Sequence, residues 1–500
     1  MNSPSREDAA GAAPLGGAPT PLPGTFGLSV DPTTKSLDQG RVLMGGSPLR
    51  LLRITARASS LVELWQAGAL VGSKRSEQIL ARRLVASGIF LPRPHSPEFG
   101  PDDVTVVIPV RDRATELGRL LDALDGLRCI VVDDGSADAG QTAAVARQAE
   151  AACFPLPTNR GPSAARNAGL SLATTPLVAF IDSDCVPANG WLLPLLAHFN
   201  DPLVGAVAPR ITPLPPENPT ALSRYEAVRS SLDRGTAAGL VRPLSRIPYV
   251  PSAALVVRRS IAPIDLFDPQ LRGGEDVDLV WRLVDAGWDV RYEPDAVVQH
   301  EGPDQVRAWI NRRAFYGTTA GPLARRHPGA LAPLHTSAWT AGVWALAGAR
   351  KPFLAAGLLA ASVAVLARRL RPLVQEPGRA AASIAAGGTV RSTVPALHGL
   401  ARAWSPALLL GLCRRRTRSA AALALLAPAL GDWSSDRPAL DPLRYTALHV
   451  ADDLAYGTGV WLGCVKARTL APLLPRITFR DRVWSAPSLR AKLARGAGEG

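Results

Sequence analysis

Apolar runs that stop at carboxylates constrain this chain more than any other feature. The run VTVVIPV at 104–110 is continuously apolar, as expected for a strand buried on both faces of a parallel sheet. Two further runs, at 128–136 and 176–184, end in Asp-Asp and Asp-Ser-Asp. Between the runs the spacing predicts helices over 116–127, 141–152 and 162–173, and a short strand at 154–158. This alternation predicts an α/β domain with a mostly parallel sheet.

The carboxylates fall where open α/β sheets bind ligands, beyond the carboxyl ends of the strands. In Asp182-Ser183-Asp184 the alternation places two carboxylates on one side of an extended chain, where they can share one Mg²⁺ or Mn²⁺. An isolated Asp-x-Asp tripeptide is most often a solvated turn. The buried strand before it and the similar pair Asp133-Asp134 therefore carry the metal-site interpretation.

A third acidic cluster opens the segment GGEDVDLVWRLVDAGW at 273–288. Glu275, Asp276 and Asp278 stand at the start of a predicted amphipathic helix, and a strand-like segment then ends at His300. A lone histidine is more often structural than a ligand, so His300 is a candidate only because of the motif before it. Helix capping is the alternative role for Glu275 and Asp278.

Composition limits the possible partners. The 500 residues are 47% hydrophobic and 20% charged, enough for a large core and several domains. The net charge of +14 favours binding to an anionic membrane or to phosphorylated ligands. We expect no nucleic-acid partner, because zinc-finger spacing and aromatic RNA-binding motifs are absent. Five scattered cysteines and an N-terminus without an apolar segment predict a reduced, cytoplasmic setting.

Four regions are predicted from changes in composition: a disordered tail at 1–25, a small α+β module at 26–95, the α/β domain at 102–325, and a helical region at 330–500. The module reads as a strand pair over 40–55 followed by two helices. That order is similar to winged-helix modules and loosely to the peptide-binding PqqD-like fold. The alternative is a packing extension of the α/β domain.

The Ala- and Leu-rich C-terminal region predicts helices associated with the cytoplasmic face of the cell membrane. None of its apolar stretches cleanly reaches the roughly 20 residues of a spanning helix, and basic residues flank several of them. A soluble Ala-rich helical domain is the alternative. The apolar stretches are 337–349, 352–367, 405–412, 420–430 and 459–465.

Six segments together resemble the family-2 glycosyltransferases, which have the GT-A fold, a Rossmann-like nucleotide-diphospho-sugar transferase domain. They follow the family's order and spacing across 102–325. The segments are VTVVIPVRDRATELGRLLDAL, IVVDDGSADAG, NRGPSAARNAGL, VAFIDSDCVP, GGEDVDLVWRLVDAGW and VRYEPDAVVQH.

The flanking segments carry a narrower resemblance, to the glycosyltransferases of the mycofactocin system. These segments are GGSPLRLLRI, GIFLPRP and DPLRYTALHVADDLAYGTGVWLGCV. The narrower family implies transfer of a sugar to a redox-cofactor precursor derived from a ribosomal peptide. The donor implied is a UDP-sugar such as UDP-glucose.

The resemblance also implies residue roles. The metal ligands would be Asp182, Asp184 and His300. The general base would be Asp276, with Glu275 as the next candidate; it would deprotonate the acceptor hydroxyl for an inverting transfer. The nucleotide-sugar site would comprise Pro109, Arg111, Glu116, Asp133, Asp134, Arg166, Asn167 and Ser183. Within this set, Asp133 or Asp134 would accept a hydrogen bond from the uracil N–H, and Glu116 has a helix-dipole role as its alternative.

Two departures from the family's motifs leave the identity of the acceptor open. The segment 249–260 lacks the Gly-Asn common in relatives, and NRRAFYG at 311–317 replaces the QxxRW signature of processive synthases. Arg312 and Arg313 could contact the diphosphate or face solvent, and Trp281, Trp288 and Trp309 could stack on a sugar or belong to the core. The competing functions are a transferase acting on a lipid or cell-wall acceptor, of the rhamnosyl or galactofuranosyl type, and a non-catalytic membrane-associated protein that binds sugar nucleotides or peptides.

Overall fold

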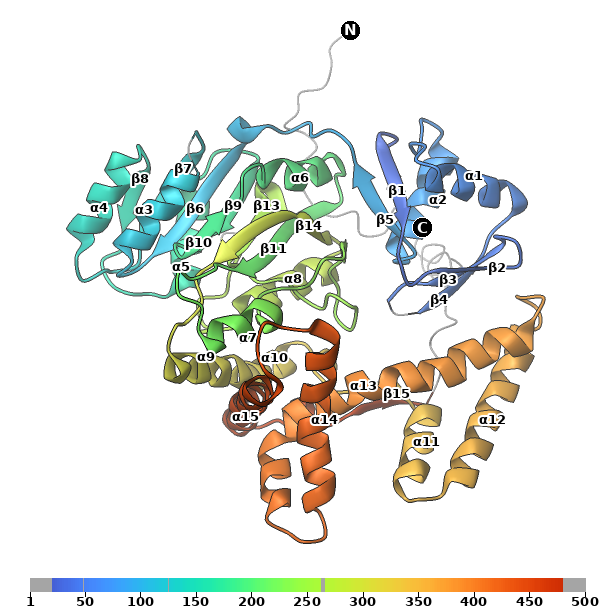
Figure 1. Cartoon of the computed structure of the whole chain (residues 1–500). Coiled ribbons are helices and arrows are strands. Elements are labelled where there is room, and N and C mark those ends of the chain that lie inside the picture. Colours follow the sequence, from blue (N-terminus) through green and yellow to red (C-terminus); the bar gives the residue numbers. More distant parts are fainter. Residues whose placement is uncertain (1–19, 48, 125, 262–265, 480–500) are drawn as a thin grey trace, which may run out of the picture.

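The computed structural model describes residues 20–47, 49–124, 126–261 and 266–479. Figure 1 shows three parts: a small N-terminal module, a central sheet covered by helices, and a C-terminal group of long helices below it. Up to position 19, the predicted tail lies outside the described residues. Its last part is ordered, because Leu22 is fully buried in the core of the N-terminal module.

The N-terminal module contains two small sheets and two helices. The predicted strand pair is confirmed as β3 (Val42–Gly45) and β4 (Arg50–Arg53), which pair antiparallel. The remaining elements are β1 (Phe26–Val30), β2 (Lys35–Leu37), α1 (Ala56–Gln66), α2 (Arg75–Ala86) and β5 (Phe90–Pro94), with β1 paired to β5. These elements enclose a core of their own around Phe26, Trp65 and Phe90.

A buried ion pair fixes this module to the central domain. Arg82 of α2 contacts Asp201 at 2.6 Å, and Asp201 also pairs with Arg291. All three side chains are almost fully buried, so the charges compensate one another where water cannot. The module therefore has its own core and is also tightly packed against its neighbour.

The central sheet has nine strands in the described residues, with the order β10-β14-β11-β13-β9-β6-β7-β8 and β12 paired to β14. Four neighbours are parallel, as predicted: β6 (Val104–Val110), β7 (Arg128–Asp133), β8 (Ala152–Pro155) and β9 (Leu177–Ile181). Every residue of β6 is buried, which confirms the reading of its apolar run. The other strands are β10 (Cys185–Pro187), β11 (Val204–Pro213), β12 (Gly239–Leu240), β13 (Ala254–Arg258) and β14 (Asp289–His300).

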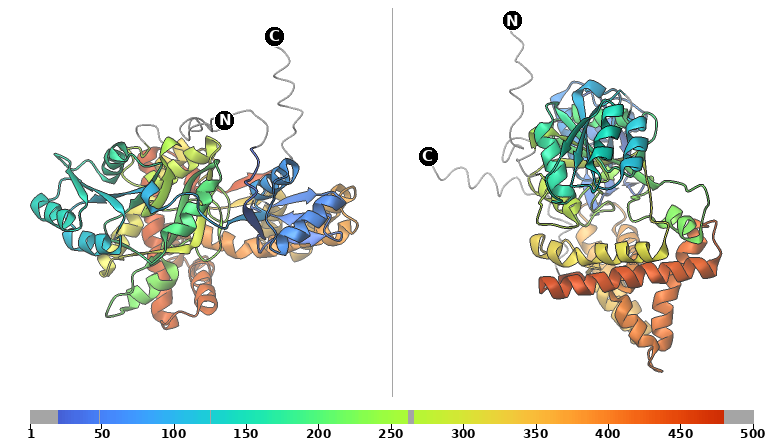
Figure 2. Two further views of the ribbon diagram at one scale, coloured as in Figure 1. Left: turned by 90° about the horizontal axis from the view of Figure 1, so that it is seen from above. Right: turned by 90° about the vertical axis from the view of Figure 1, so that its left-hand side faces the viewer.

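Helices cover both faces of this sheet, so its strands are buried on both sides (Figure 2). The predicted boundaries were wrong by up to four residues. For example, the helix expected over 141–152 spans 139–148, because Asp138 caps it by accepting the backbone N–H of Gln141. The helices are α3 (Ala114–Ala123), α4 (Ala139–Gln148), α5 (Pro162–Leu172), α6 (Leu192–Ala197), α7 (Ala221–Arg229) and α8 (Glu275–Asp285).

The C-terminal region is helical, as predicted, but its longest helix was missed. Sequence reading found only 405–412 of α13, which spans Pro377–Leu412 and contains Pro395 and Pro406. Its first part is rich in Ala, Gly, Ser and Thr and has no apolar stretch. Helices α9 (Val306–Thr318) and α10 (Ala320–Arg326) end the central domain. The elements of the C-terminal region are β15 (His335–Ser337), α11 (Ala338–Gly348), α12 (Pro352–Leu370), α13, α14 (Arg418–Asp436), α15 (Pro442–Ala467) and β16 (Arg476–Thr478).

One helix among the described residues, α12, is long and apolar enough to cross a membrane by length and composition. The helix has 19 residues. An 18-residue window of it has a mean hydropathy of 1.7, and 11% of that window is buried. The sequence predicts only that no apolar stretch cleanly reaches about 20 residues; α12 continues three residues beyond the predicted 352–367 and comes close to that length.

Glycines join the C-terminal helices to the central domain. Helix α15 crosses α9 and α10 at backbone contact: a Cβ on Gly459 would lie 2.0 Å from the carbonyl oxygen of Ala314, and one on Gly463 would lie 2.4 Å from that of Thr318. Gly317 meets the backbone of Tyr456 in the same way. The two parts therefore pack too closely for larger residues at these positions.

Candidate active site

The carboxyl ends of the parallel strands bring the first two acidic clusters to one edge of the sheet. Asp133 is the last residue of β7, and Asp182 follows the last residue of β9. Strand β6 lies between β7 and β9, so the two clusters flank its end. The predicted convergence is confirmed.

The two aspartates after β7 have different surroundings. Asp134 accepts the backbone N–H groups of Arg160 (2.7 Å) and Gly161 (2.8 Å), and so holds the loop that leads into α5. Asp133 accepts the N–H of Ser136 with one oxygen (2.8 Å). Its other oxygen, Oδ2, is buried and has no hydrogen-bond partner among the described residues. Because an unsatisfied buried acceptor is costly, Asp133 is the one suited to receive an N–H from a ligand.

The Asp-Ser-Asp segment lies next to His300, as the metal-site interpretation requires. Strand β10 pairs with β14 so that Cys185 is opposite His300. The His300 Nε2 lies 3.5 Å from the Asp184 Oδ1. Asp184 also pairs with Arg113, while Asp182 pairs with Arg166 at 2.5 Å. Ser183, between them, is buried.

This donor set fits a divalent cation in its chemistry, since carboxylate oxygens with one imidazole suit Mg²⁺ or Mn²⁺. In this arrangement Asp184 and His300 are close together, whereas the Asp182 carboxylate is held by Arg166. Within the described part of the chain, no three His, Cys, Asp or Glu side chains gather closely enough to hold a metal ion by themselves. A bound diphosphate and water molecules would supply the remaining ligands.

The third acidic cluster opens helix α8. Gly274, with φ of 75°, turns the chain into the helix, a conformation that favours glycine. Burial raises the pKa of Asp276 to about 7, and the neighbouring charge of Glu275 adds to this effect. A carboxylate with a pKa near the working pH is suited to accept a proton. Asp278 instead pairs with His327 (2.9 Å) and Arg282 (2.7 Å), which supports its structural role.

Arg166 connects the two halves of the site. It lies on α5 with only 3% of its surface exposed, and it contacts Asp182 at 2.5 Å and Glu275 at 3.2 Å. One buried cation therefore positions the carboxylate after β9 and the carboxylate that begins α8. Its neighbour Asn167 does not share this position: its amide exchanges two hydrogen bonds with the backbone of Phe267, at 2.7 and 3.0 Å. Both ends of the Asn167 side-chain amide therefore bind the protein backbone, and its predicted contact with the nucleotide sugar stays a prediction.

The remaining predicted residues differ in burial and in whether they line the cavity. Pro109 is buried within β6, Arg111 is exposed and pairs only loosely with Asp112 (3.5 Å), and Glu116 stands in the first turn of α3. Arg313 does not face solvent: it is buried against Glu226 (2.5 Å) and Asp452 (3.3 Å). Of the three tryptophans, Trp281 lines the cavity described next, while Trp309 packs in a core with Tyr225.

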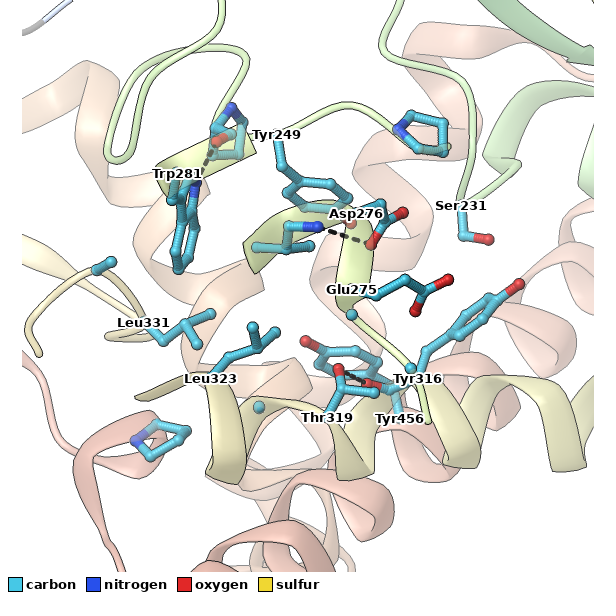
Figure 3. Close-up of a pocket in the computed structure, with 18 of the residues that line it drawn as sticks. Ser231, Tyr249, Glu275, Asp276, Trp281, Tyr316, Thr319, Leu323, Leu331 and Tyr456 are labelled. Carbon is cyan, nitrogen blue, oxygen red and sulfur yellow. Dashed lines mark hydrogen bonds between the residues drawn. The ribbon is translucent and has the colours of Figure 1, made fainter. Parts of the chain in front are cut away.

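A cavity of about 700 Å³ joins these groups. Asp182, Arg166 and His300 lie on its wall together with Glu275 and Asp276. Figure 3 shows the two carboxylates of α8 between Tyr249 on one side and Tyr316, Thr319 and Tyr456 on the other. The size is typical of a pocket for a small molecule.

The C-terminal helices supply much of the cavity wall, which sequence reasoning missed. Arg402 and Ala403 of α13, and Tyr456 and Val460 of α15, line it opposite α8. The Arg402 guanidinium stacks on the Tyr456 ring at 4.2 Å, and Arg234 stacks on Tyr249 at 4.4 Å. The lining residues of α13 and α15 are more than 120 positions from Asp276, and no motif spacing relates them to it.

The α/β sheet, the acidic strand ends and the carboxylates of α8 define a glycosyltransferase of the GT-A fold. Residues 105–262 match the model of glycosyl transferase family 2. The chain is 42% identical over 473 residues to the pre-mycofactocin glycosyltransferase of Mycobacterium tuberculosis (strain H37Rv), covering 92% of this chain and 99% of that protein. The chain therefore belongs to the pre-mycofactocin glycosyltransferase family.

More distant similarities cover less of the chain. Glycosyltransferase AglE of Haloferax volcanii is 27% identical over 234 residues, which is 41% of this chain and 74% of that protein. Among solved structures, a mannosyltransferase of Pyrobaculum calidifontis in complex with GDP-Man and Mn²⁺ is 20% identical, with a TM-score of 0.34, and covers 68% of this chain and 91% of that one. A TM-score this low supports no inference about this chain.

Proposed function

We propose that this protein moves a sugar from a UDP-sugar to a small, peptide-derived redox-cofactor precursor, with inversion at the anomeric carbon. The observation that carries the proposal is the placement of Asp276, with its pKa near 7, in the same cavity as Asp182 and His300. The donor-side and acceptor-side groups thereby line one cavity. UDP-glucose is the first donor to test.

The reaction would proceed in one displacement. Asp276 takes the proton from the acceptor hydroxyl as that oxygen forms a bond to the anomeric carbon, and the bond from this carbon to the UDP oxygen breaks. Attack opposite the leaving group converts an α-linked donor into a β-linked product. No covalent enzyme intermediate is needed, since acceptor and donor react directly.

The leaving group would be held at the sheet edge. Asp133 Oδ2 is available to the uracil N–H, and Arg113 and Arg166 offer positive charge near the diphosphate. Asp184 and His300, with Asp182 beside them, would hold a Mg²⁺ or Mn²⁺ ion. When bound, such an ion neutralises charge on the departing diphosphate.

The family supports the acceptor assignment, since 99% of the M. tuberculosis pre-mycofactocin glycosyltransferase is matched, including the flanking regions. The cavity supports it too. Helices α13 and α15 close the wall opposite Asp276, which suits a small molecule better than a long polymer. A lipid or cell-wall acceptor is the competing assignment.

The substitution Asp276→Asn tests the mechanism. We expect transfer to fall by roughly 100- to 10,000-fold, the range for loss of a general base, while UDP binding measured by calorimetry stays within about twofold. Asp285→Asn is the matched control, because Asp285 is an exposed residue on the same helix. Turnover unchanged in Asp276→Asn would remove the assigned base.

Metal dependence is tested separately by thermal shift with UDP. Mn²⁺ should raise the Tm further in the parent protein, and this extra shift should shrink in Asp184→Asn and in His300→Gln. Equal UDP stabilisation with Mn²⁺ and with EDTA would contradict a metal at these residues.

A further inference from the structure

Two helical hairpins project from the C-terminal region on the side away from the central sheet. The first is formed by α11 and α12, and the second by the end of α13 and α14. Their tips, at 348–354 and 409–418, both point away from the central sheet in Figure 1. Neither tip belongs to a core cluster of the described residues.

Both hairpins expose large apolar side chains. Phe353 is 91% exposed at the first tip, and Leu354 beside it is 57% exposed. On the second hairpin, Leu410 is 71% exposed and Leu423 is 68% exposed. Isolated exposed leucines are ordinary, but several on two parallel projections form an apolar surface that marks an interaction site.

Basic residues surround these apolar side chains. Arg350 and Lys351 stand at the first tip, and Arg414, Arg415, Arg416 and Arg418 at the second, all of them exposed. Between Asp304 and Asp432 the sequence contains a single acidic residue, Glu376, at the opposite end of α12. Exposed apolar groups beside Arg and Lys, with almost no acidic residues, match an anionic lipid surface in both polarity and charge.

The other end of each hairpin is attached to the rest of the protein. At the end of α12, Leu370 and Val374 pack with Val42 of the N-terminal module, and Arg53 donates to the carbonyl of Pro372 (3.1 Å). On α13, the Ser405 hydroxyl donates to the carbonyl of Asp453 (2.8 Å). The tips are therefore free to enter a lipid bilayer, while the bases of the hairpins stay packed against the N-terminal module and the other C-terminal helices.

We propose that the two hairpins form a membrane foot: their tips insert into one leaflet of an anionic bilayer, and the catalytic domain stays in the aqueous phase. Although α12 has the length to cross a bilayer, its far end is joined to the N-terminal module, so the arrangement favours lying in one leaflet. The inference does not rest on the sugar donor or acceptor.

Vesicle flotation of the full chain tests the proposal. Vesicles of phosphatidylglycerol and phosphatidylcholine are compared with pure phosphatidylcholine vesicles. We expect binding to the anionic vesicles that weakens in 0.5 M NaCl. The triple substitution R414Q/R415Q/R416Q should weaken this binding on the order of 100-fold, and F353D/L410D should abolish it.

Matched variants keep the test interpretable. R57Q/R75Q/R83Q removes the same charge from exposed arginines of the N-terminal module, and L64D/L70D adds aspartates at leucines that are 56% and 47% exposed there. Both should float like the parent, and all variants should melt like it.

Three results would overturn the proposal. The first is a parent that does not float with anionic vesicles, and the second is hairpin variants that float as well as the controls. The third is a parent dimer, found by light scattering, that F353D/L410D converts to monomer without any vesicle binding. That result would show that the hairpin tips bind a second copy of the chain and not a membrane.

Discussion

At the scale of single residues, Arg166 and the carboxylates around it decide what the site can do. The guanidinium binds Asp182 and Glu275 but leaves Asp276 with a raised pKa. Neighbouring carboxylates on one helix turn therefore have different roles: Glu275 forms an ion pair, and Asp276 is poised to exchange a proton. Environment, and not residue type, separates them.

The pKa of Asp276 predicts the pH dependence of transfer. Since a base acts in its deprotonated form, kcat/KM should rise with pH through about 7 and level off above it. Glu275→Gln removes the negative charge that raises this pKa, so the rising limb should move to lower pH. An initial-rate pH profile of both proteins measures this, and a limb at the same pH in both would contradict the assigned coupling.

Asp133 and Asp134 should differ when substituted. Asp133→Asn should weaken UDP binding by roughly tenfold, the value of a hydrogen bond to a charged acceptor, with little change in Tm. Asp134→Asn should lower the Tm, because Asp134 holds the backbone of Arg160 and Gly161. Calorimetry with UDP and thermal melts separate the two effects; reversed results would exchange their roles.

At the scale of elements, the crossing of α15 over α9 and α10 joins the catalytic domain to the helices that close its cavity. This contact depends on glycines that let backbones touch. It also places Tyr456 at the cavity wall, one turn from Gly459 on the same helix. The packing of α15 and the shape of the acceptor side are therefore linked.

Gly459→Ala should lower the free energy of unfolding by about 2 kcal/mol, because the added Cβ would overlap the carbonyl oxygen of Ala314. Gly431→Ala is the control: Gly431 lies on α14 with open space around its Cβ position, and alanine is the better helix former. Urea denaturation of both variants measures the difference. Equal stabilities would show that the helices can separate at no cost.

At the scale of the whole molecule, three parts meet around one sheet. The N-terminal module contacts the central domain through Arg82 and contacts the end of α12 through Val42. The C-terminal helices contact the central domain through α15. The candidate active cavity lies on this second junction, so part of its wall comes from a region outside the family-2 match at 105–262.

Arg82→Met should destabilise the protein by about 3 kcal/mol, since it removes one of the two arginines that compensate the buried Asp201 carboxylate. Exposed Arg83 on the same helix gives the control Arg83→Met, which should be near neutral. Denaturant unfolding compares them. A neutral Arg82→Met would mean that Arg291 alone satisfies Asp201.

Much of the α/β domain was predictable, because a strand buried on both faces must be apolar throughout and helices between parallel strands need a 3.6-residue period. Those local rules found β6, β7, β9 and the acidic strand ends, and motif order identified the helix of Asp276. Boundaries were less accurate because caps such as Asp138 decide them. The first part of α13 was missed because it contains small residues, whose burial depends on what packs against them.

The sequence by itself determined where the candidate catalytic groups lie: Asp133, Asp182 and Asp184 at strand ends, and Asp276 at a helix start. Periodicity and motif order are local properties, so one chain is enough to read them. Only the tertiary structure decided that the Asn167 amide binds the backbone of Phe267, that Arg166 joins two clusters, and that Arg402 and Tyr456 line the same cavity as Asp276. Those facts join residues up to 180 positions apart in the sequence, and such long-range packing leaves no local pattern to read.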